Sequence, residues 1–587
     1  MTPLLAELSA AAGRAFAAEG FDPALGKVDF SNRADLAQFQ CNGALAAAKI
    51  SSAAPRAVAE QIAGRLRGEK LFAKVEIAGP GFINLDMSDD ALVRRAGVMA
   101  ADAQLGAPQT GRHKTLVIDF GGPNVAKPMH VGHLRTAIIG DSLQRLFRAN
   151  GWRVLSDVHL GDWGLPMGQL IAEIGRRGIA PLYFDASFSG PYPQDSPVTM
   201  EELEEMYPAA AAACKTDLAH LDEARAATAD LQSGRPGYRA LWRHFFDVSE
   251  RGLKREFASL GVVFDLWKGE ADVDSLIGPM IEDLKARKLA EMSEGALIVP
   301  VSEAGDKKEI PPLILLKSDG AVLYGTTDLA TIVDRVQAHD PDLILYVVDQ
   351  RQHLHFEQVF RAARKAELNG RASLEHVGYG TVNGPDGKPF KTRAGGVMKL
   401  YDLIGMATKE AALRLQEQGL AVEYSVNERE DVAKAVGLAA IKFADLANFR
   451  TSDYLFDLIR FTAFEGKTGP YLQYAAVRIQ SILRRADQEC LTRSAPKIES
   501  VEERRLLLLL ASLTDAMANA EIRRAPNVLC DFAFVLAQEF SRFYTAHHIL
   551  SETDIGRRAA RLGLCELTLR VMTKVLDLLG IQIPPKM

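Results

Sequence analysis

The sequence predicts an α/β protein whose central doubly wound parallel sheet is preceded by an α+β unit and followed by an all-α bundle. Three observations predict this order. Helical and strand-like stretches mix in residues 1–108, apolar runs alternate with helical patterns in residues 109–455, and apolar stripes at helical spacing fill residues 456–587. Because single cores stop growing at roughly 250–300 residues, a chain of 587 residues needs several domains.

Composition limits the class of protein. The net charge is −6, with 48% apolar and 25% charged residues, as in ordinary soluble proteins. None of the five cysteines falls in a CxxC pair, so we expect no zinc site and no disulfide framework. The first residues, MTPLLAELSAAAGRAF, lack a basic segment, and the apolar stretch at 506–510 is far too short to span a membrane. We therefore expect a cytoplasmic protein with no membrane partner.

The first unit, residues 1–108, combines three alanine-rich helical patterns with two strands. The helices are expected near 4–18, 34–49 and 54–67. The strands are expected at 73–77 and 82–85, joined by a turn at Gly79-Pro80-Gly81. The glycine- and proline-containing segment 103–112 is typical of a linker.

The central unit, residues 109–455, begins with a strand at 114–120, a loop, a helix from His130 to Ala149 and a strand at 152–159. This βαβ order implies a parallel sheet with its ligand at the carboxyl ends of the strands. Acidic and alanine-rich helices then indicate an insertion at about 175–305. The α/β alternation resumes with strands at 313–316, 322–324 and 343–348 and a helix at 328–338.

The last unit, residues 456–587, is expected to be helical throughout. Two apolar stripes have the spacing of helix faces that pack in a core. They are Phe532, Leu536, Phe540 and Phe543, and Leu567, Val571, Val575 and Leu579.

The stretch DFGGPNVAKPMHVGH, residues 119–133, is the strongest candidate site. His130 and His133 are three apart at a predicted helix start, where imidazoles donate to phosphoryl oxygens as charge builds. Gly132 lets a nucleotide approach the backbone, and Lys127 adds a cation beside the same phosphates. The alternative is a coincidental HxGH on a helix surface.

The segments GPN, VAKPMHVGHLR and GWRVLSDVHLGDWGLPMG resemble the HIGH signature region of arginyl-tRNA synthetases. The resemblance implies that His130, Gly132 and His133 bind ATP. It also implies that Asp119 and Asn124 bind arginine, which agrees with the acceptor oxygens of both side chains. The alternative for Asp119 is a turn-forming aspartate.

The segment YGTTD, residues 324–328, resembles the arginine pocket of the same family. Tyr324 is expected to close a strand and Asp328 to lie in the first turn of the next helix, where a carboxylate suits a planar guanidinium. The alternative is a core tyrosine and a helix-capping aspartate. Gln352 matches a further arginine-binding position, with Gln350 close enough to compete for the role.

The segment GKPFKTRAGGVMK, residues 387–399, stands where class I synthetases have the KMSKS loop, but the motif is degenerate. Lys391 is expected to act in catalysis, and Lys388 and Arg393 to bind ATP, because mobile cations neutralise a pyrophosphate leaving group. The resemblance implies that Lys127 compensates for the missing KMSKS motif. The alternative is a solvated basic turn.

The flanking units also resemble the family. Segments 465–486 and 570–587 are similar to its helical anticodon-binding domain. In the N-terminal unit, Phe82 and Asn84 of GFIN match an aromatic and an amide that contact tRNA. Core packing is the alternative for Phe82.

The resemblance implies an ATP-dependent arginine–tRNA ligase that uses Mg²⁺ with ATP, holds no tightly bound cofactor, requires tRNA even for its first step and is a monomer. Two alternatives stay open: a class I synthetase for another amino acid, and a tRNA-binding paralogue without catalysis. A small nucleotidylyltransferase shares HxGH but does not need the helical region at 456–587.

Overall fold

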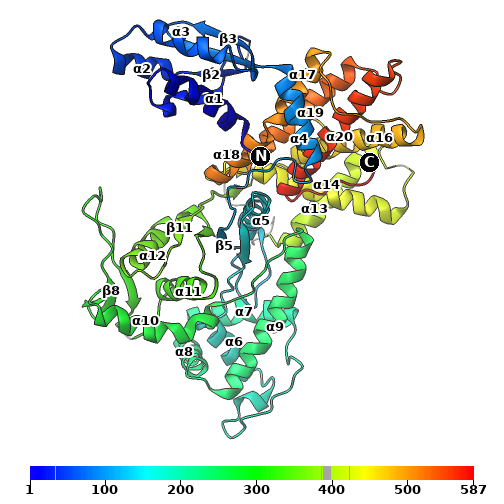
Figure 1. Cartoon of the computed structure of the whole chain (residues 1–587). Helices are drawn as coiled ribbons and strands as arrows, with labels where there is room; N and C mark the ends of the chain where they lie inside the picture. Colours follow the sequence, from blue (N-terminus) through cyan, green and yellow to red (C-terminus); the bar gives the residue numbers. More distant parts are fainter. Residues whose placement is uncertain (34, 319, 385–386, 388–397, 422) are drawn as a thin grey trace.

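The computed structural model describes residues 1–33, 35–318, 320–384, 387, 398–421 and 423–587. The parts of the chain follow one another from the top to the bottom of the view in Figure 1. The N-terminal unit and the C-terminal helices lie at one end, the parallel sheet lies in the middle, and the inserted helices α6–α9 lie at the other end.

The N-terminal unit is a four-stranded antiparallel sheet, in the order β1-β2-β4-β3, covered by helices. Its elements are α1 (Leu4–Ala18), β1 (Val28–Phe30), β2 (Phe39–Cys41), α2 (Gly43–Ser51), α3 (Pro55–Leu66), β3 (Phe72–Ala78) and β4 (Phe82–Met87). The helix expected at 34–49 is wrong in its first half, where β2 lies. Phe39 is fully buried and pairs with Leu85, so tertiary pairing decides against the local alanine-rich pattern.

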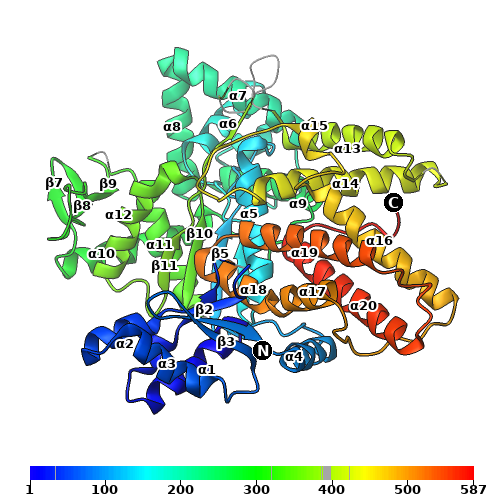
Figure 2. The same cartoon turned by 90° about the horizontal axis from the view of Figure 1, so that it is seen from above.

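Helix α4 (Asp89–Ala101) joins this unit to the rest of the chain and packs against α17 (Val501–Ala511), which precedes α18 (Leu513–Arg523) among the C-terminal helices. The contact is also visible from above, where α1 and α4 border α17 and α18 (Figure 2). The carboxylate of Asp515 accepts from the N–H groups of Leu4 and Leu5 at 2.8 and 2.9 Å. Asp515 thus provides partners for N–H groups in the first turn of α1 that have none within that helix.

The central sheet is parallel, in the order β11-β10-β5-β6. Its strands are β5 (Thr115–Phe120), β6 (Arg153–Asp157), β10 (Leu343–Val347) and β11 (Ser373–His376), and the helices that follow them in the chain include α5 (Leu134–Ala149), α11 (Tyr324–His339) and α12 (His353–Lys365). All six residues of β5 are buried, as expected for a strand covered on both faces. The predicted βαβ unit and the strand at 343–348 are confirmed.

Between β6 and α11 the chain forms a mainly helical insertion and a small antiparallel sheet, β7-β8-β9. The elements are α6 (Leu165–Arg176), α7 (Met200–Thr216), α8 (Leu218–Gln232), α9 (Pro236–Ser259), α10 (Asp274–Ala286), β7 (Glu291–Ser293), β8 (Ala296–Val299) and β9 (Leu313–Leu316). The strand expected at 313–316 exists but belongs to this small sheet, because a short apolar run does not specify its partner. The strand expected at 322–324 is wrong: Val322 makes a single bridge to Leu316, and Tyr324 begins α11.

The helical region begins earlier than residue 456. Its helices are α13 (Leu400–Glu417), α14 (Val426–Leu446), α15 (Leu458–Phe461), α16 (Gly469–Gln488), α17 (Val501–Ala511), α18 (Leu513–Arg523), α19 (Asn527–Ala546) and α20 (Ile555–Leu578). The short strands β12 (Val382–Asn383) and β13 (Tyr454–Leu455) pair in parallel. Both predicted apolar stripes are buried in the core.

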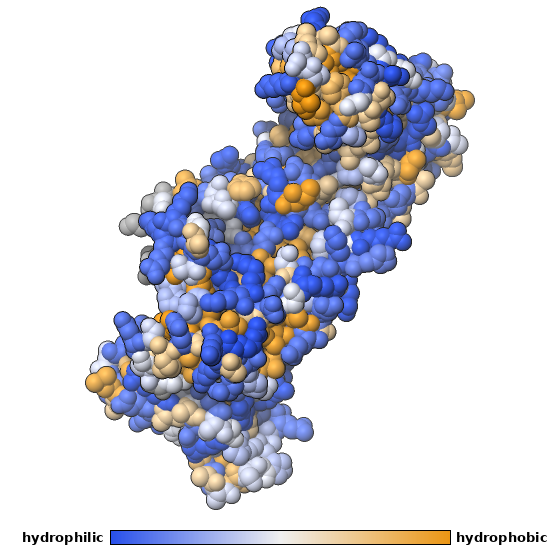
Figure 3. Space-filling view, turned by 60° about the vertical axis from the view of Figure 1, so that its left-hand side comes forward, coloured by the Kyte–Doolittle hydropathy of each residue, from blue (hydrophilic) through white to orange (hydrophobic). Residues whose placement is uncertain are grey.

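The face in Figure 3 is mostly hydrophilic, with hydrophobic residues in small scattered groups. Scattered exposed apolar side chains are normal for a water-facing surface and indicate no site by themselves. In the part of the chain that the structure describes, no helix combines the length and apolar character needed to cross a membrane.

Candidate functional site

The strand order changes direction at β5, and the predicted site residues gather at its carboxyl end. The chain forms β6 on one side of β5 and later β10 on the other. Asp119 in β5 is in register with Tyr346 of β10 and Asp157 of β6. A crevice at such a switch point is where open α/β sheets bind ligands.

The loop from β5 to α5 is anchored to helix α9. The N–H of Ala126 donates to Oγ of Ser249 at 2.9 Å, and the N–H of Met129 donates to Oε2 of Glu256 at 2.8 Å. Ala126 has a positive φ of 63°, a conformation that such bonds help to hold. The insertion therefore shapes the loop that carries the histidines.

His130 and His133 face each other across a tight turn. The helix expected from His130 begins at Leu134, after a 3-10 turn at Val131–His133. The two imidazole centroids are 4.0 Å apart. The N–H of Gly132 donates to Nδ1 of His130 at 3.0 Å, and the N–H of His130 donates to Nδ1 of His133 at 3.2 Å. Since each Nδ1 is an acceptor, the proton of each neutral ring sits on Nε2.

Both rings are neutral near pH 7. Burial lowers the pKa of His130, and the charge of Lys127 acts in the same direction. Burial, His130 and Lys127 together lower the pKa of His133 to about 3. The histidines can therefore serve as hydrogen-bond donors through Nε2, while the positive charge at the site is supplied by lysine. Gly132 is exposed between them, and an added Cβ would come within 2.6 Å of the His130 ring.

Asn124 and Asp119 precede this turn in the chain, and they differ in exposure and in hydrogen bonding. Asn124 is exposed, and an added Cβ on Gly161 of the GDWG segment would come within 2.3 Å of its Oδ1. Asp119 is buried, and its Oδ2 accepts from Nη2 of Arg335 at 2.6 Å. The same nitrogen donates to Oδ2 of Asp157 at 2.7 Å. Asp119 thus has a structural role as a partner of Arg335.

Tyr324 and Asp328 both belong to α11. Tyr324 is the first residue of this helix and is 69% exposed, which corrects the expectation that it closes a strand. Asp328 lies one turn later, on the same face of the helix. Its Oδ2 is 2.5 Å from Nε2 of His355 at the start of α12. The next helix therefore orients the carboxylate, while Tyr324 presents its ring to solvent.

Sequence reasoning missed Glu270. Burial, and then the carboxylates of Asp162 and Asp328, raise its pKa to about 8. Asp162 is fully buried, its Oδ1 accepts from the N–H of Ala271 at 3.1 Å, and burial raises its pKa to about 7. Buried carboxyl groups with raised pKa values are candidates for a functional site, because a nearby cation would favour their charged form. A single glutamate after a glycine carries no local motif, although Asp162 belongs to the GDWG segment.

The two candidate glutamines differ in packing. Gln352 is exposed in a 3-10 turn after β10. Gln350 packs closely on Gly378, where an added Cβ would come within 2.1 Å of its Oε1. Gln350 is exposed as well, so exposure does not separate the two candidates. Lys388, Lys391 and Arg393 lie outside the described residues.

The two candidate tRNA contacts lie on β4, between β2 and β3. Phe82 is half-buried, and its ring lies against Gly79. Asn84 is 7% exposed, and its Oδ1 accepts from Nε2 of Gln40 at 2.9 Å. Phe82 is thus the more accessible of the pair.

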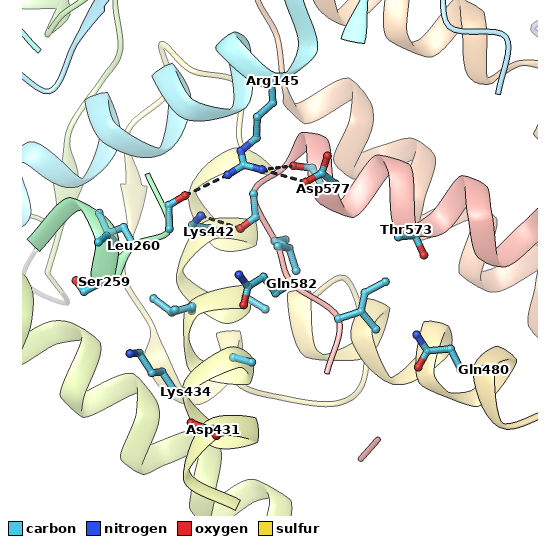
Figure 4. Close-up of a pocket in the computed structure, with 18 residues that line it drawn as sticks. Arg145, Ser259, Leu260, Asp431, Lys434, Lys442, Gln480, Thr573, Asp577 and Gln582 are labelled. Atoms are coloured by element: carbon cyan, nitrogen blue, oxygen red, sulfur yellow. Dashed lines mark hydrogen bonds and ion pairs between the residues drawn. The ribbon is translucent and has the colours of Figure 1, made fainter. Parts of the chain in front are cut away.

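A separate cavity of about 760 Å³ lies away from these residues, between α5, α9, α14, α16 and the end of α20 (Figure 4). Arg145 of α5 points to Asp577 of α20, with Nη1 3.0 Å from its Oδ1. Lys442 of α14 donates to the carbonyl of Gly580 at 2.7 Å. Burial lowers the pKa of Lys442 to about 8, against the opposing charge of Asp141. The contact between Arg145 and Asp577 joins α5, which follows the histidine turn, to α20, the last helix of the chain.

Among the described residues, no three His, Cys, Asp or Glu side chains group as a metal site. All five cysteines are free, and only Cys490 is exposed.

Three protein-family models match the chain. The catalytic domain of class I (R) tRNA synthetases matches residues 96–458. The DALR anticodon binding domain matches residues 472–587, and the arginyl tRNA synthetase N terminal domain matches residues 4–87. Together with the parallel sheet and the histidine turn, these matches define a class I aminoacyl-tRNA synthetase.

Full-length relatives make the family specific. The chain is 54% identical to the arginine–tRNA ligase of Maricaulis maris and 51% identical to that of Hyphomonas neptunium, with 100% of each chain covered. The chain belongs to the arginyl-tRNA synthetase family. Its fold is similar to the arginyl-tRNA synthetase of Thermus thermophilus, with a TM-score of 0.80 at 23% identity over 100% of both chains. The Plasmodium falciparum structure gives 0.80 at 23% identity over 95% of this chain and 94% of that one.

Proposed function

We propose that this chain activates L-arginine with MgATP and transfers it to tRNA(Arg). A carboxylate oxygen of arginine attacks the α-phosphorus, and the bond to pyrophosphate breaks. The terminal ribose hydroxyl of the tRNA then attacks the carbonyl carbon of the adenylate, and AMP leaves with the electron pair. No side-chain nucleophile is needed, so catalysis consists of positioning and charge stabilisation.

His130 and His133 would donate from Nε2–H to phosphate oxygens of ATP. The single observation that supports this role is the pair of backbone N–H bonds to Nδ1, which leaves both Nε2 protons available. Gly132 leaves room for the nucleotide, and Lys127 supplies positive charge. Lys391 would act in the same step, and Lys388 and Arg393 would bind ATP.

Arginine would lie with its α-ammonium at Asp119, Asn124 and Gln352 and its guanidinium at Tyr324 and Asp328. Glu270 would supply a further carboxylate near the guanidinium of the bound arginine. The raised pKa of Glu270 supports this placement, because an arriving cation offsets the cost of charging a carboxyl group that is buried and lies near Asp162 and Asp328.

Residues 1–108 would contact tRNA through Phe82 and Asn84, residues 109–455 would hold the chemistry, and residues 456–587 would bind the anticodon. The anticodon-binding model that matches 472–587 supports the last assignment. We further propose a cytoplasmic monomer whose first step requires bound tRNA.

The test is ATP–pyrophosphate exchange with each amino acid, with and without tRNA. Exchange with arginine that requires tRNA is the expected result. Exchange with another amino acid would contradict the arginine pocket, and no exchange from a folded, tRNA-binding chain would favour the paralogue without catalysis.

The pocket itself is tested by Asp328→Asn. A hydrogen bond to a charged group contributes about 1.5–3 kcal/mol, so the KM for arginine should rise roughly 10- to 100-fold while the KM for ATP changes little. Asp340→Asn at the end of the same helix is the matched control, because Asp340 is exposed and asparagine tolerates its positive φ. Equal effects of both substitutions on arginine would contradict the assignment.

A further inference from the structure

One face of helix α7 holds two lysines that flank the histidine turn. The ammonium of Lys127 lies 4.3 Å from the ring centroid of Tyr207. The Nζ of Lys399 lies 2.7 Å from Oε2 of Glu204. Glu204 and Tyr207 are three residues apart in α7, so they project from the same side of the helix. A helix of the insertion therefore contacts two lysines that lie close to the histidine turn in the chain or through backbone pairing.

The backbone places Lys399 directly beside His130. The N–H of Val131 donates to the carbonyl of Met398 at 3.0 Å, and the N–H of Leu400 donates to the carbonyl of Met129 at 3.0 Å. His130 and Lys399 are paired in this short antiparallel bridge. The flexible side chain of Lys399 thus starts next to the proposed phosphate-binding turn.

The contact that holds Lys399 is weak enough for a ligand to replace it. The side chain of Lys399 is 54% exposed, and ion pairs that water reaches are weak. The hydrogen bond that Lys399 donates to Glu204, followed by the charges of Glu204, Asp402 and Glu256, raises the pKa of Lys399, so its charge persists. A triphosphate carries more negative charge than one glutamate and can compete for the same ammonium.

We propose that Lys399 binds the β- and γ-phosphates of ATP, and that Glu204 and Tyr207 hold Lys399 and Lys127 in a resting position that ATP displaces. As the bond to pyrophosphate breaks, the leaving group takes the electron pair, and Lys399 neutralises part of the added charge. The proposal rests on the activation reaction proposed above.

The test is pyrophosphate exchange at saturating arginine and tRNA with MgATP varied. Lys399→Met should lower kcat/KM for ATP about tenfold or more and leave the KM for arginine within about twofold. Lys399→Arg keeps the charge and should retain most activity. Lys409→Met, at an exposed lysine of α13, is the matched control. An unchanged kcat/KM for ATP in Lys399→Met would overturn the proposal.

Glu204→Gln tests the resting position. It should raise kcat/KM for ATP about two- to fivefold, and this gain should vanish in Glu204→Gln/Lys399→Met. Glu201→Gln, exposed on the same helix, should have no effect. A gain that persists without Lys399, or a loss in Glu204→Gln alone, would overturn the role of Glu204. Absence of arginine-dependent exchange in the wild-type chain would instead overturn the proposed function and this inference with it.

Discussion

Arg335 holds helix α11 to the central sheet, and replacing it tests how far this buried charge cluster supports the site. Its guanidinium is 1% exposed and bridges Asp119 at 2.6 Å and Asp157 at 2.7 Å. Burial opposes its charge, but Asp119, Tyr346 and Asp157 outweigh burial and raise the pKa of Arg335 above its ordinary value. The arginine therefore stays charged between the carboxyl ends of β5 and β6.

Arg335→Met keeps most of the volume and removes the charge. Two buried carboxylates are then left facing each other, and breaking a buried ion pair from one side costs about 3–5 kcal/mol. Native stabilities are only about 5–15 kcal/mol, so this loss is a large fraction of the total. Because α11 also carries Asp328, the affinity for arginine should fall in parallel.

Urea denaturation followed by tryptophan fluorescence measures the loss of stability in the part of the chain that contains Arg335. All four tryptophans lie in residues 109–455: Trp152, Trp163, Trp242 and Trp267. Arg371→Met is the matched control, since its pair with Asp340 is half-exposed and contributes at most about 1 kcal/mol. Arg335→Met/Asp157→Asn should recover about 1 kcal/mol or more, because one buried carboxylate becomes neutral. A loss in Arg335→Met no larger than in Arg371→Met would refute the reasoning.

Two further predictions concern the contact between Asp515 and α1, and the protonation state of His133. Asp515→Ala removes the acceptor for the first N–H groups of α1 and should lower stability by about 0.5–2 kcal/mol. Limited proteolysis should then cut the linker near 103–112 faster than in Asp515→Asn, which keeps an acceptor oxygen, and equal rates would count against the contact. The pKa of His133 falls from 6.5 to about 3 on folding, so the unfolded chain binds more protons between these values and stability decreases as the pH falls below about 6.5. Urea midpoints at pH 7 and pH 5 should therefore differ more in the wild type than in His133→Asn, and an equal difference would contradict the neutral, buried state of His133.

Local patterns were sufficient where a structural feature depends on neighbours in the sequence. The strand ending at Phe120, the short loop and α5 lie close together in the chain, so their pattern predicts the order strand, loop and helix, while the phosphate-binding role of the histidines stays a prediction. The apolar stripe from Phe532 to Phe543 likewise predicts its own burial, because a helix face repeats at fixed spacing.

Tertiary structure decided what distant segments do to one another. It makes β2 a strand within an alanine-rich stretch, because Phe39 pairs with a strand more than forty residues later. It turns Asp119 into a partner of Arg335, brings Glu270 beside Asp328, and sets Lys399 against Glu204 of the insertion. The sequence by itself determined the fold class and the strand–loop–helix segment that carries His130 and His133, because those depend on local periodicity and spacing. The path of the whole chain decided which charged side chains meet at the site. Ion pairs and pKa shifts arise from proximity in space, so they leave no local pattern in the sequence.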